Sequence, residues 1–210
     1  MPRRPSPSAA PGAASRRVRL APDARRQQLV DIATRLLDEH GPAGVEMTAV
    51  AEAAGITRPV IYKFFATRDA LLAGVLDDFV ADLGGRYHAA LAGSLGAPMD
   101  RIAQAFIEAS CDAIAARGAG PWRLLYARGA DVAAAALGRA ALHRLLAPWL
   151  PRIGELTGLP PARVELLVAI VVASGGAALD GWIEGRMRRR DAVQVATRVV
   201  TALLRELSRR

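Results

Sequence analysis

Apolar residues recur at intervals of three or four along most of this 210-residue chain, and no segment alternates between apolar and polar side chains as a strand does. The first apolar stripe starts at Leu29 and the last one ends at Leu207. This spacing predicts an all-α protein of about nine helices, without an internal repeat. Because 52% of the residues are hydrophobic, the chain can bury a substantial core.

Capping residues, glycines and prolines divide the chain into helical segments. In the N-terminal part we expect helices at 23–40, at 48–54 with Thr48 as N-cap, after an N-cap at Thr57, and from Thr67 to Gly84-Gly85, which end or loosen the fourth helix. In the remainder we expect helices around 102–114, at 122–128, at 131–150, from 160 to about 185, and after the basic turn at 186–190.

Positive charge is concentrated in the N-terminal third of the chain. Eleven Lys and Arg residues oppose six Asp and Glu residues between positions 1 and 68, which gives +5 of the total charge of +8. A basic balance favours polyanionic partners, either nucleic acid or an acidic membrane surface, although a GC-rich genome also enriches arginine. Residues 1–22 are rich in Pro, Ser, Ala and Arg and predict a disordered basic tail, either a solvated leader or an arm that touches DNA.

Three features predict a cytoplasmic protein that does not enter a membrane. The single cysteine, Cys111, cannot form an internal disulfide, which suits a reducing compartment, and its apolar neighbours predict a buried, inert thiol. No apolar run follows the N-terminus, so no secretion signal is expected. The most apolar stretch, 166–179, is shorter than a bilayer span and is followed by Asp180.

The stretch AEAAGITRPVIYKFF, residues 51–65, predicts two short helices that meet at Gly55. Ala51 is small enough for a close helix crossing, and Gly55 can adopt the positive φ of a sharp turn. The apolar residues that would face inward are Val50, Ala54, Ile56, Ile61 and Phe64. The other face of the second helix carries Arg58, Pro59, Tyr62 and Lys63, and a basic, aromatic helix face suits the major groove of DNA. The alternative is an ordinary helical hairpin with Tyr62 and Lys63 as surface residues.

Residues 24–83 resemble the DNA-binding domain of the tetracycline-repressor (TetR) family of bacterial transcriptional regulators. The resemblance lies in the order of a long first helix, TAVAEAAGI, TRPVIYKFF and ATRDALL. It implies base contacts by Thr57, Arg58, Pro59 and Val60, and phosphate or backbone contacts by Thr48, Tyr62, Lys63 and Arg68. Two positions depart from the family: Phe64 stands where histidine is common, and Val60 is bulkier than the usual residue.

The resemblance also implies a domain organisation. A tail (1–22) precedes a three-helix helix-turn-helix domain (23–68), and helix four joins it to a C-terminal ligand-binding and dimerisation domain (69–210). The last two helices would pair with those of a second subunit as a four-helix bundle, which predicts a palindromic operator. Residues 164–184 are apolar nearly all round, and the small residues 174–178 permit close backbone approach, or else mark a kink or a flexible segment.

An effector pocket would lie among the middle helices and would be mostly apolar. The candidate lining residues are Phe106, Ser110, Trp122, Tyr126, His143, Trp149 and Trp182. Each has an alternative, since aromatic residues at helical spacing also form core and His143 could be a surface histidine. Glu108 and Asp112 could anchor a cationic ligand or be solvated surface residues. The aliphatic, alanine-rich surroundings favour a hydrophobic effector.

The sequence lacks an enzymatic signature. It contains no Cys/His metal spacing, no Gly-rich phosphate loop and no nucleophile elbow, and its three histidines are widely separated. We therefore expect no catalytic residues, no metal and no cofactor. The expected function is a ligand-responsive DNA-binding transcriptional regulator, a repressor by family resemblance, that acts as a homodimer. The alternatives are a helical protein-interaction adaptor and a small-molecule carrier without coupling to DNA.

Overall fold

The computed structural model describes residues 20–94, 96–127 and 131–207. Within these residues it contains α-helices and two short 3-10 helices but no strand, which confirms the predicted all-α class. The α-helices are α1 (Pro22–His40), α2 (Met47–Ala53), α3 (Arg58–Phe64), α4 (Arg68–Ala92), α5 (Met99–Arg117), α6 (Ala119–Leu125), α7 (Val132–Leu146), α8 (Leu150–Thr157), α9 (Pro161–Ile183) and α10 (Arg189–Leu207). The 3-10 helices are η1 (Pro42–Gly44) and η2 (Ala147–Trp149).

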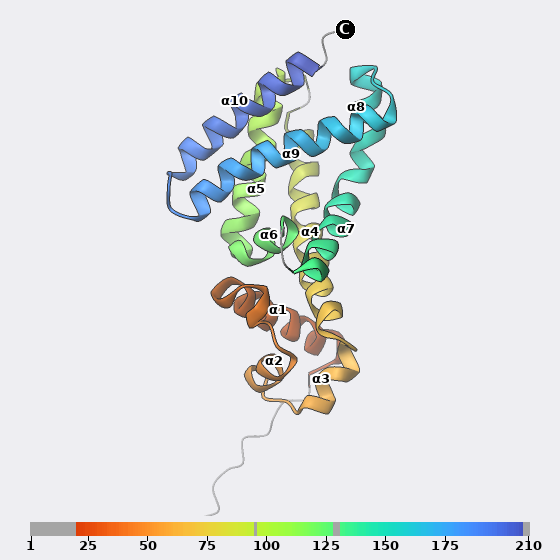
Figure 1. Ribbon diagram of the computed structural model, residues 1–210, viewed down its shortest axis with the longest axis vertical. Helices are drawn as coiled ribbons and strands as arrows, with labels where there is room; N and C mark the ends of the chain where they lie inside the picture. The colour runs from red at the N-terminus through yellow and green to blue at the C-terminus, as the bar shows by residue number, and fades with distance from the viewer. Residues whose placement is uncertain (1–19, 95, 128–130, 208–210) are drawn as a thin grey trace, which may run out of the picture.

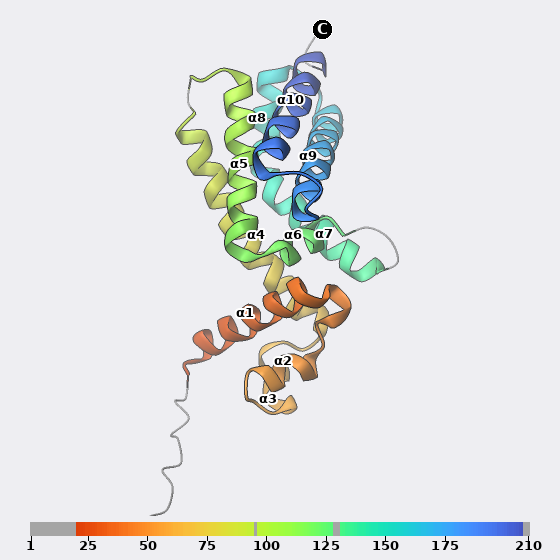
Figure 2. The ribbon, with the colours of Figure 1, turned by 90° about the vertical axis from the view of Figure 1, so that its left-hand side faces the viewer.

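The molecule has a small lower domain and a larger upper domain (Figure 1). Helices α1, α2 and α3 form the lower domain, and α4 runs from it into the upper domain, which α5 to α10 complete. Figure 2 shows α3 at the lower end of the molecule, far from the C-terminal helices. The predicted tail at 1–22 lies almost entirely outside the described residues.

The lower domain is built around buried side chains from all three of its helices. Leu29, Ala33 and Leu37 of α1 are at most 1% exposed, and Val50 of α2 and Ile61 of α3 are fully buried. These contacts hold the two short helices, which are too short to be stable alone.

Gly55 makes the turn between α2 and α3, as predicted. Its φ is +63°, a conformation that L side chains rarely adopt. The backbone N–H of Ile56 donates to the carbonyl of Ala51 at 3.0 Å, which closes the C-terminus of α2 as in a Schellman motif.

The caps of α2 and α4 test two of the expected helix starts. Thr67 is the N-cap of α4, and its hydroxyl accepts a hydrogen bond from the backbone N–H of Ala70 at 3.1 Å. The prediction for α2 was wrong, because Glu46 is its N-cap and Thr48 is already the second residue of the helix. The N-cap of α2 therefore lies two residues earlier in the chain than the sequence pattern indicated.

The expected break at Gly84-Gly85 was also wrong, since α4 continues through both glycines to Ala92. A Cβ on Gly84 would lie 3.6 Å from the Leu145 side chain of α7, which is an ordinary van der Waals contact, and a Cβ on Gly85 would meet no atom within 4 Å. Neither glycine is required by a close approach of another helix.

Two prolines divide the segment that we expected to be a single helix at 131–150. Helix α7 ends at Leu146, Pro148 lies in η2, and Pro151 occupies the first turn of α8, where a missing N–H costs no hydrogen bond. Helix α6 likewise begins at Ala119, earlier than the expected 122, because Pro121 fits its first turn.

Helix α9 is long and apolar enough, by length and composition alone, to cross a membrane. The expectation that this segment is too short therefore fails for the whole helix. In the structure α9 packs beside α10 on one face of the upper domain (Figure 1), yet only 39% of its most apolar window is buried. It is unbroken at 174–178, where Gly175 and Gly176 are buried against side chains of α5, α6 and α10 of the same chain.

Candidate nucleic-acid interface

The exposed surface of α3 carries most of the residues predicted to contact DNA. Ile61 is the only residue of this helix in the buried class, whereas Arg58, Pro59, Tyr62 and Lys63 are exposed. Thr57 is the exposed N-cap residue of α3, although its hydroxyl makes no capping bond. Val60 is half-buried. The structure therefore brings six of the eight candidates together on one short helix.

The charges on this face are available to a partner. The Arg58 guanidinium lies 5.8 Å from the centroid of the Tyr62 ring, one helical turn away, in cation–π geometry. In the part of the chain that the structure describes, no carboxylate forms an ion pair with Arg58 or Lys63. An anion that approached α3 would thus meet two uncompensated cations and a phenol.

The remaining two candidates lie at the starts of neighbouring helices. Thr48 is exposed near the start of α2, with its hydroxyl 3.5 Å from the Glu46 carboxylate. Arg68 is the first residue of α4, and its side chain is 31% exposed.

Arg68 holds the lower domain together in a way that sequence reasoning missed. Its Nε donates to the backbone carbonyl of Val45 at 2.9 Å, and its Nη2 donates to the carbonyl of Pro42. The Pro42–Val45 segment leads directly into α2, so these bonds hold the segment that precedes α2 against the start of α4. No local sequence pattern indicates such a contact across more than twenty residues.

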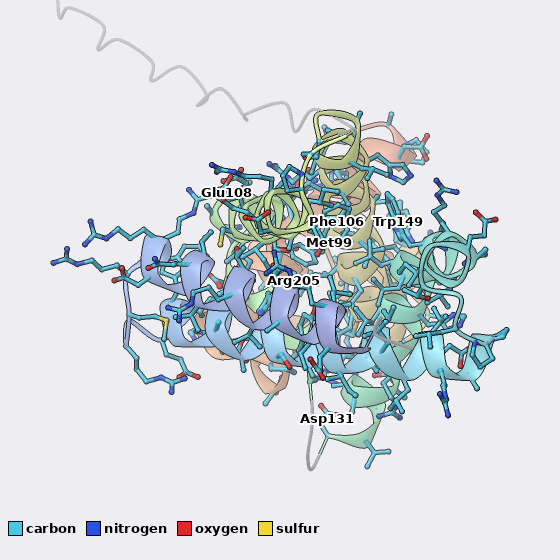
Figure 3. All side chains as sticks on the ribbon, turned by 90° about the horizontal axis from the view of Figure 1, so that it is seen from above. Met99, Phe106, Glu108, Asp131, Trp149 and Arg205 are labelled. Carbon is cyan, nitrogen blue, oxygen red and sulfur yellow. The ribbon has the colours of Figure 1, made fainter. Side chains whose placement is uncertain are left out.

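In the upper domain, three of the pocket candidates form one aromatic cluster. Phe106 packs edge-on against Trp149, with ring centroids 5.7 Å apart, and also contacts Tyr87 at 4.9 Å. The Tyr87 hydroxyl and the Ser110 hydroxyl are hydrogen-bonded at 2.8 Å. Figure 3 shows Phe106 and Trp149 next to each other when the domain is seen from above. Burial raises the pKa of the Tyr87 phenol, so it is a neutral hydrogen-bonding group here.

Trp122 and Tyr126 form a second aromatic pair with ring centroids 4.4 Å apart. The Trp122 indole N–H donates to the Asp180 carboxylate of α9 at 3.1 Å. Trp182 is half-buried and packs against the core, whereas His143 is exposed in the last turn of α7. The structure thus separates His143 from both clusters.

Two surface grooves lie elsewhere in the upper domain, and none of the seven pocket candidates lines either. One, of about 840 Å³, runs between α5 and α10 and includes Glu108 and Asp112. Asp112 forms an ion pair with Arg189 of α10. The other, of about 500 Å³, lies between α8 and α9. Behind the first groove Cys111 is fully buried, and burial raises the pKa of its thiol, which agrees with the predicted inert cysteine.

The described residues contain no group of three or more His, Cys, Asp or Glu side chains placed to hold a metal ion.

Comparison with known families identifies the lower domain. Residues 29–75 match the sequence model of the bacterial regulatory proteins of the tetR family. The HTH-type transcriptional repressor KstR2 of Rhodococcus jostii is 34% identical over 71 residues, which are 34% of this chain and 35% of that protein. The similarity to this relative therefore spans about a third of its length.

Solved structures extend the likeness to the whole fold. A tetR-family transcriptional regulator from Streptomyces coelicolor superimposes with a TM-score of 0.61 over 90% of both chains, at 22% identity. The regulator LfrR of Mycobacterium smegmatis, solved in complex with proflavine, has a TM-score of 0.54 at 19% identity and covers 85% of this chain and 95% of its own. At these identities the likeness is one of fold.

Proposed function

Because this chain belongs to the tetR family of bacterial regulatory proteins, we propose that it is a ligand-responsive transcriptional regulator that binds operator DNA through α3. The observation that carries the proposal is the exposed face of α3, a helix at the lower end of the molecule (Figure 2), where Arg58 and Lys63 pair with no carboxylate of the described residues and Tyr62 is exposed. A helix whose opposite side is anchored by one buried residue, Ile61, can enter a major groove without unfolding its own domain.

The proposed contacts follow the geometry of the lower domain. Thr57, Arg58, Pro59 and Val60 form the first turn of α3 and would face base edges, as the N-terminal part of a recognition helix does. Tyr62 and Lys63, one turn later, would contact phosphates.

Thr48 and Arg68 would contact phosphates from the starts of α2 and α4. For Arg68 this role is secondary, since two of its nitrogens already hold the segment before α2.

Homodimerisation is proposed from the apolar residues that one subunit leaves exposed. Leu166 and Ile170 on α9 and Val195 and Val199 on α10 are 38–61% exposed and lie one turn apart on each helix. A second copy of the α9–α10 pair would cover both stripes in a four-helix bundle. Two α3 helices would then bind the two halves of a palindromic operator.

Repression is the proposed mode of regulation, because KstR2 is a repressor. A cytoplasmic location is proposed as well, because the protein must reach the chromosome.

A small hydrophobic effector is proposed to bind among the aromatic residues of the upper domain. LfrR, which shares this fold, was solved in complex with proflavine, and this supports a small-molecule ligand for the present chain. Phe106, Ser110 and Trp149 offer an aromatic surface with one hydroxyl pair, while Trp122, Tyr126 and Trp182 offer a second surface beside Asp180. An effector that binds better to a form with separated lower domains would release the DNA.

Fluorescence anisotropy with a labelled duplex of the gene's own upstream region tests the proposal. We expect the logarithm of the binding constant to fall linearly with the logarithm of salt concentration, by roughly 0.9 per phosphate that Lys or Arg neutralises. Replacing Lys63 by Ala should reduce that slope by about 2, one for each subunit of a dimer.

Arg139→Ala provides the control, since it removes an exposed cation of α7, far from α3, and should leave the slope unchanged. Salt-independent association, or equal slopes for the wild type and Lys63→Ala, would favour a protein adaptor or a carrier that is not coupled to DNA.

A further inference from the structure

Helix α6 is only seven residues long, yet it contacts helices from both domains. Its first residues meet the C-terminal end of α1, where the backbone N–H of Gly120 donates to the Asp38 carboxylate at 2.8 Å. The Asp38 carboxylate of α1 thus caps α6, because it accepts a hydrogen bond from one of the free N–H groups at the start of that helix.

The approach between α1 and α6 at this point is as close as backbones allow. A Cβ built on Gly120 would lie 2.6 Å from the backbone nitrogen of Asp38 and 2.8 Å from its Cα. A Cβ on Gly118, where φ is +83°, would lie 3.0 Å from the Asp38 carboxylate. Only glycine permits this contact, so the two helices cannot slide past each other without breaking it.

The other side of α6 is tied to α9 and α7. Trp122 is 2% exposed, and its indole N–H donates to Asp180 of α9 at 3.1 Å. On α7, a Cβ on Gly138 would lie 2.5 Å from the backbone carbonyl of Leu124. Helix α6 is therefore clamped between α1, which belongs to the DNA-binding domain, and α9, which carries the exposed apolar stripe.

We propose that Asp38 is a positioning residue for DNA recognition. Its bond to Gly120 fixes the C-terminal end of α1 on α6, and through Trp122 and Asp180 it fixes the lower domain relative to α9. In a dimer joined through α9 and α10, this chain of contacts sets the separation of the two α3 helices. The inference rests on the proposed function, since it assigns the residue that orients the proposed DNA-binding surface.

The test compares a duplex that carries both half-sites, located by footprinting on the upstream region, with a duplex in which one half-site is scrambled. Asp38→Ala should weaken binding to the full site about 3- to 10-fold, the equivalent of one lost hydrogen bond per dimer, and should leave half-site binding unchanged. Asp38→Asn retains an acceptor oxygen and should behave as the wild type. Asp31→Ala, which removes another exposed carboxylate of α1, is the matched control.

Hydrogen exchange of the Gly120 amide gives a readout that does not depend on DNA. It should become faster in Asp38→Ala, but not in Asp38→Asn or Asp31→Ala. If Asp38→Ala fails to fold, Asp180→Ala, which removes the acceptor of the Trp122 indole N–H and leaves the buried ring in place, carries the same expectation for the full site.

Equal losses on the full site and on the half-site would overturn the positioning role, as would wild-type binding by Asp38→Ala. Absence of DNA binding by the wild type would instead refute the proposed function, whereas the exchange result would still decide whether the Asp38 bond holds α1 on α6.

Discussion

Arg58 is the first residue of α3 and Arg68 is the first residue of α4, and the two side chains have different surroundings. Arg58 is exposed, pairs with no carboxylate of the described residues and lies near the Tyr62 ring. Arg68 is half-buried, and two of its nitrogens donate hydrogen bonds to backbone carbonyls of its own domain. The family resemblance implies a base contact for Arg58 and a backbone contact for Arg68, but it does not indicate the hydrogen bonds that Arg68 makes within its own domain.

At Arg58 we expect a change in base recognition. Arg58→Ala should lower the affinity for the upstream duplex by about 1–3 kcal/mol and relax the preference at one base position of each half-site, because a guanidinium on a base edge is lost. The free energy of unfolding should not change, since the side chain is exposed. Anisotropy titrations against a set of single-base operator variants measure both effects, and unchanged affinity and base preference would argue against a base contact.

At Arg68 we expect a substitution to reduce stability even when it keeps the positive charge. Arg68→Lys keeps the cation but cannot reach both carbonyls, because an ammonium lacks the planar fork of a guanidinium. The free energy of unfolding of the lower domain should fall by about 1–3 kcal/mol, the range for losing hydrogen bonds that involve a charged group. Urea unfolding measures it, with Arg58→Lys as the exposed control. A fully stable Arg68→Lys protein that binds DNA normally would indicate that Arg68 serves mainly as a phosphate contact.

At the scale of helices, capping residues, glycines and apolar spacing predicted the elements well where the backbone conformation of a residue depends on its neighbours in sequence. Gly55 turns with positive φ, Thr67 caps α4, and α1, α9 and α10 begin and end close to the expected positions. The all-α class and the presence of a helix-turn-helix followed from the same local signals.

The features that the sequence did not predict depend on contacts between residues far apart in the chain. Gly84 resembles a helix break, but it lies inside α4, which packs against α5 and α7 along its length. Gly120 and Gly138 resemble loop or filler residues, yet each lies against a backbone of another helix. The same holds at the site, where the exposed face of α3 was predictable and the bonds of Arg68 and Asp38 across the chain were not.

For the molecule as a whole, α9 has an inner face that contacts other helices of the chain and an outer face that is exposed. Its inner face meets α6 through Asp180 and Gly176, and α6 in turn holds the end of α1. Its outer face presents Leu166 and Ile170 to solvent in a single subunit. A change in how two subunits pack along α9 would thus reach the lower domain through contacts that exist in the structure.

The outer face of α9 supplies the test of oligomeric state. Leu166 is 61% exposed, so Leu166→Glu should leave the fold of one subunit intact, whereas a carboxylate in the centre of an apolar subunit interface loses its water. We expect the wild type to be a dimer at micromolar concentration and Leu166→Glu to be a monomer that retains only half-site affinity. Light scattering coupled to size-exclusion chromatography measures the mass.

Val132→Glu on α7 is the matched control, because Val132 is 73% exposed but lies outside the α9–α10 face, and this variant should remain dimeric. A dimeric Leu166→Glu protein would place the interface on another surface, and a wild type that is monomeric both with and without DNA would rule out the two-fold arrangement of α3 on which a palindromic operator depends.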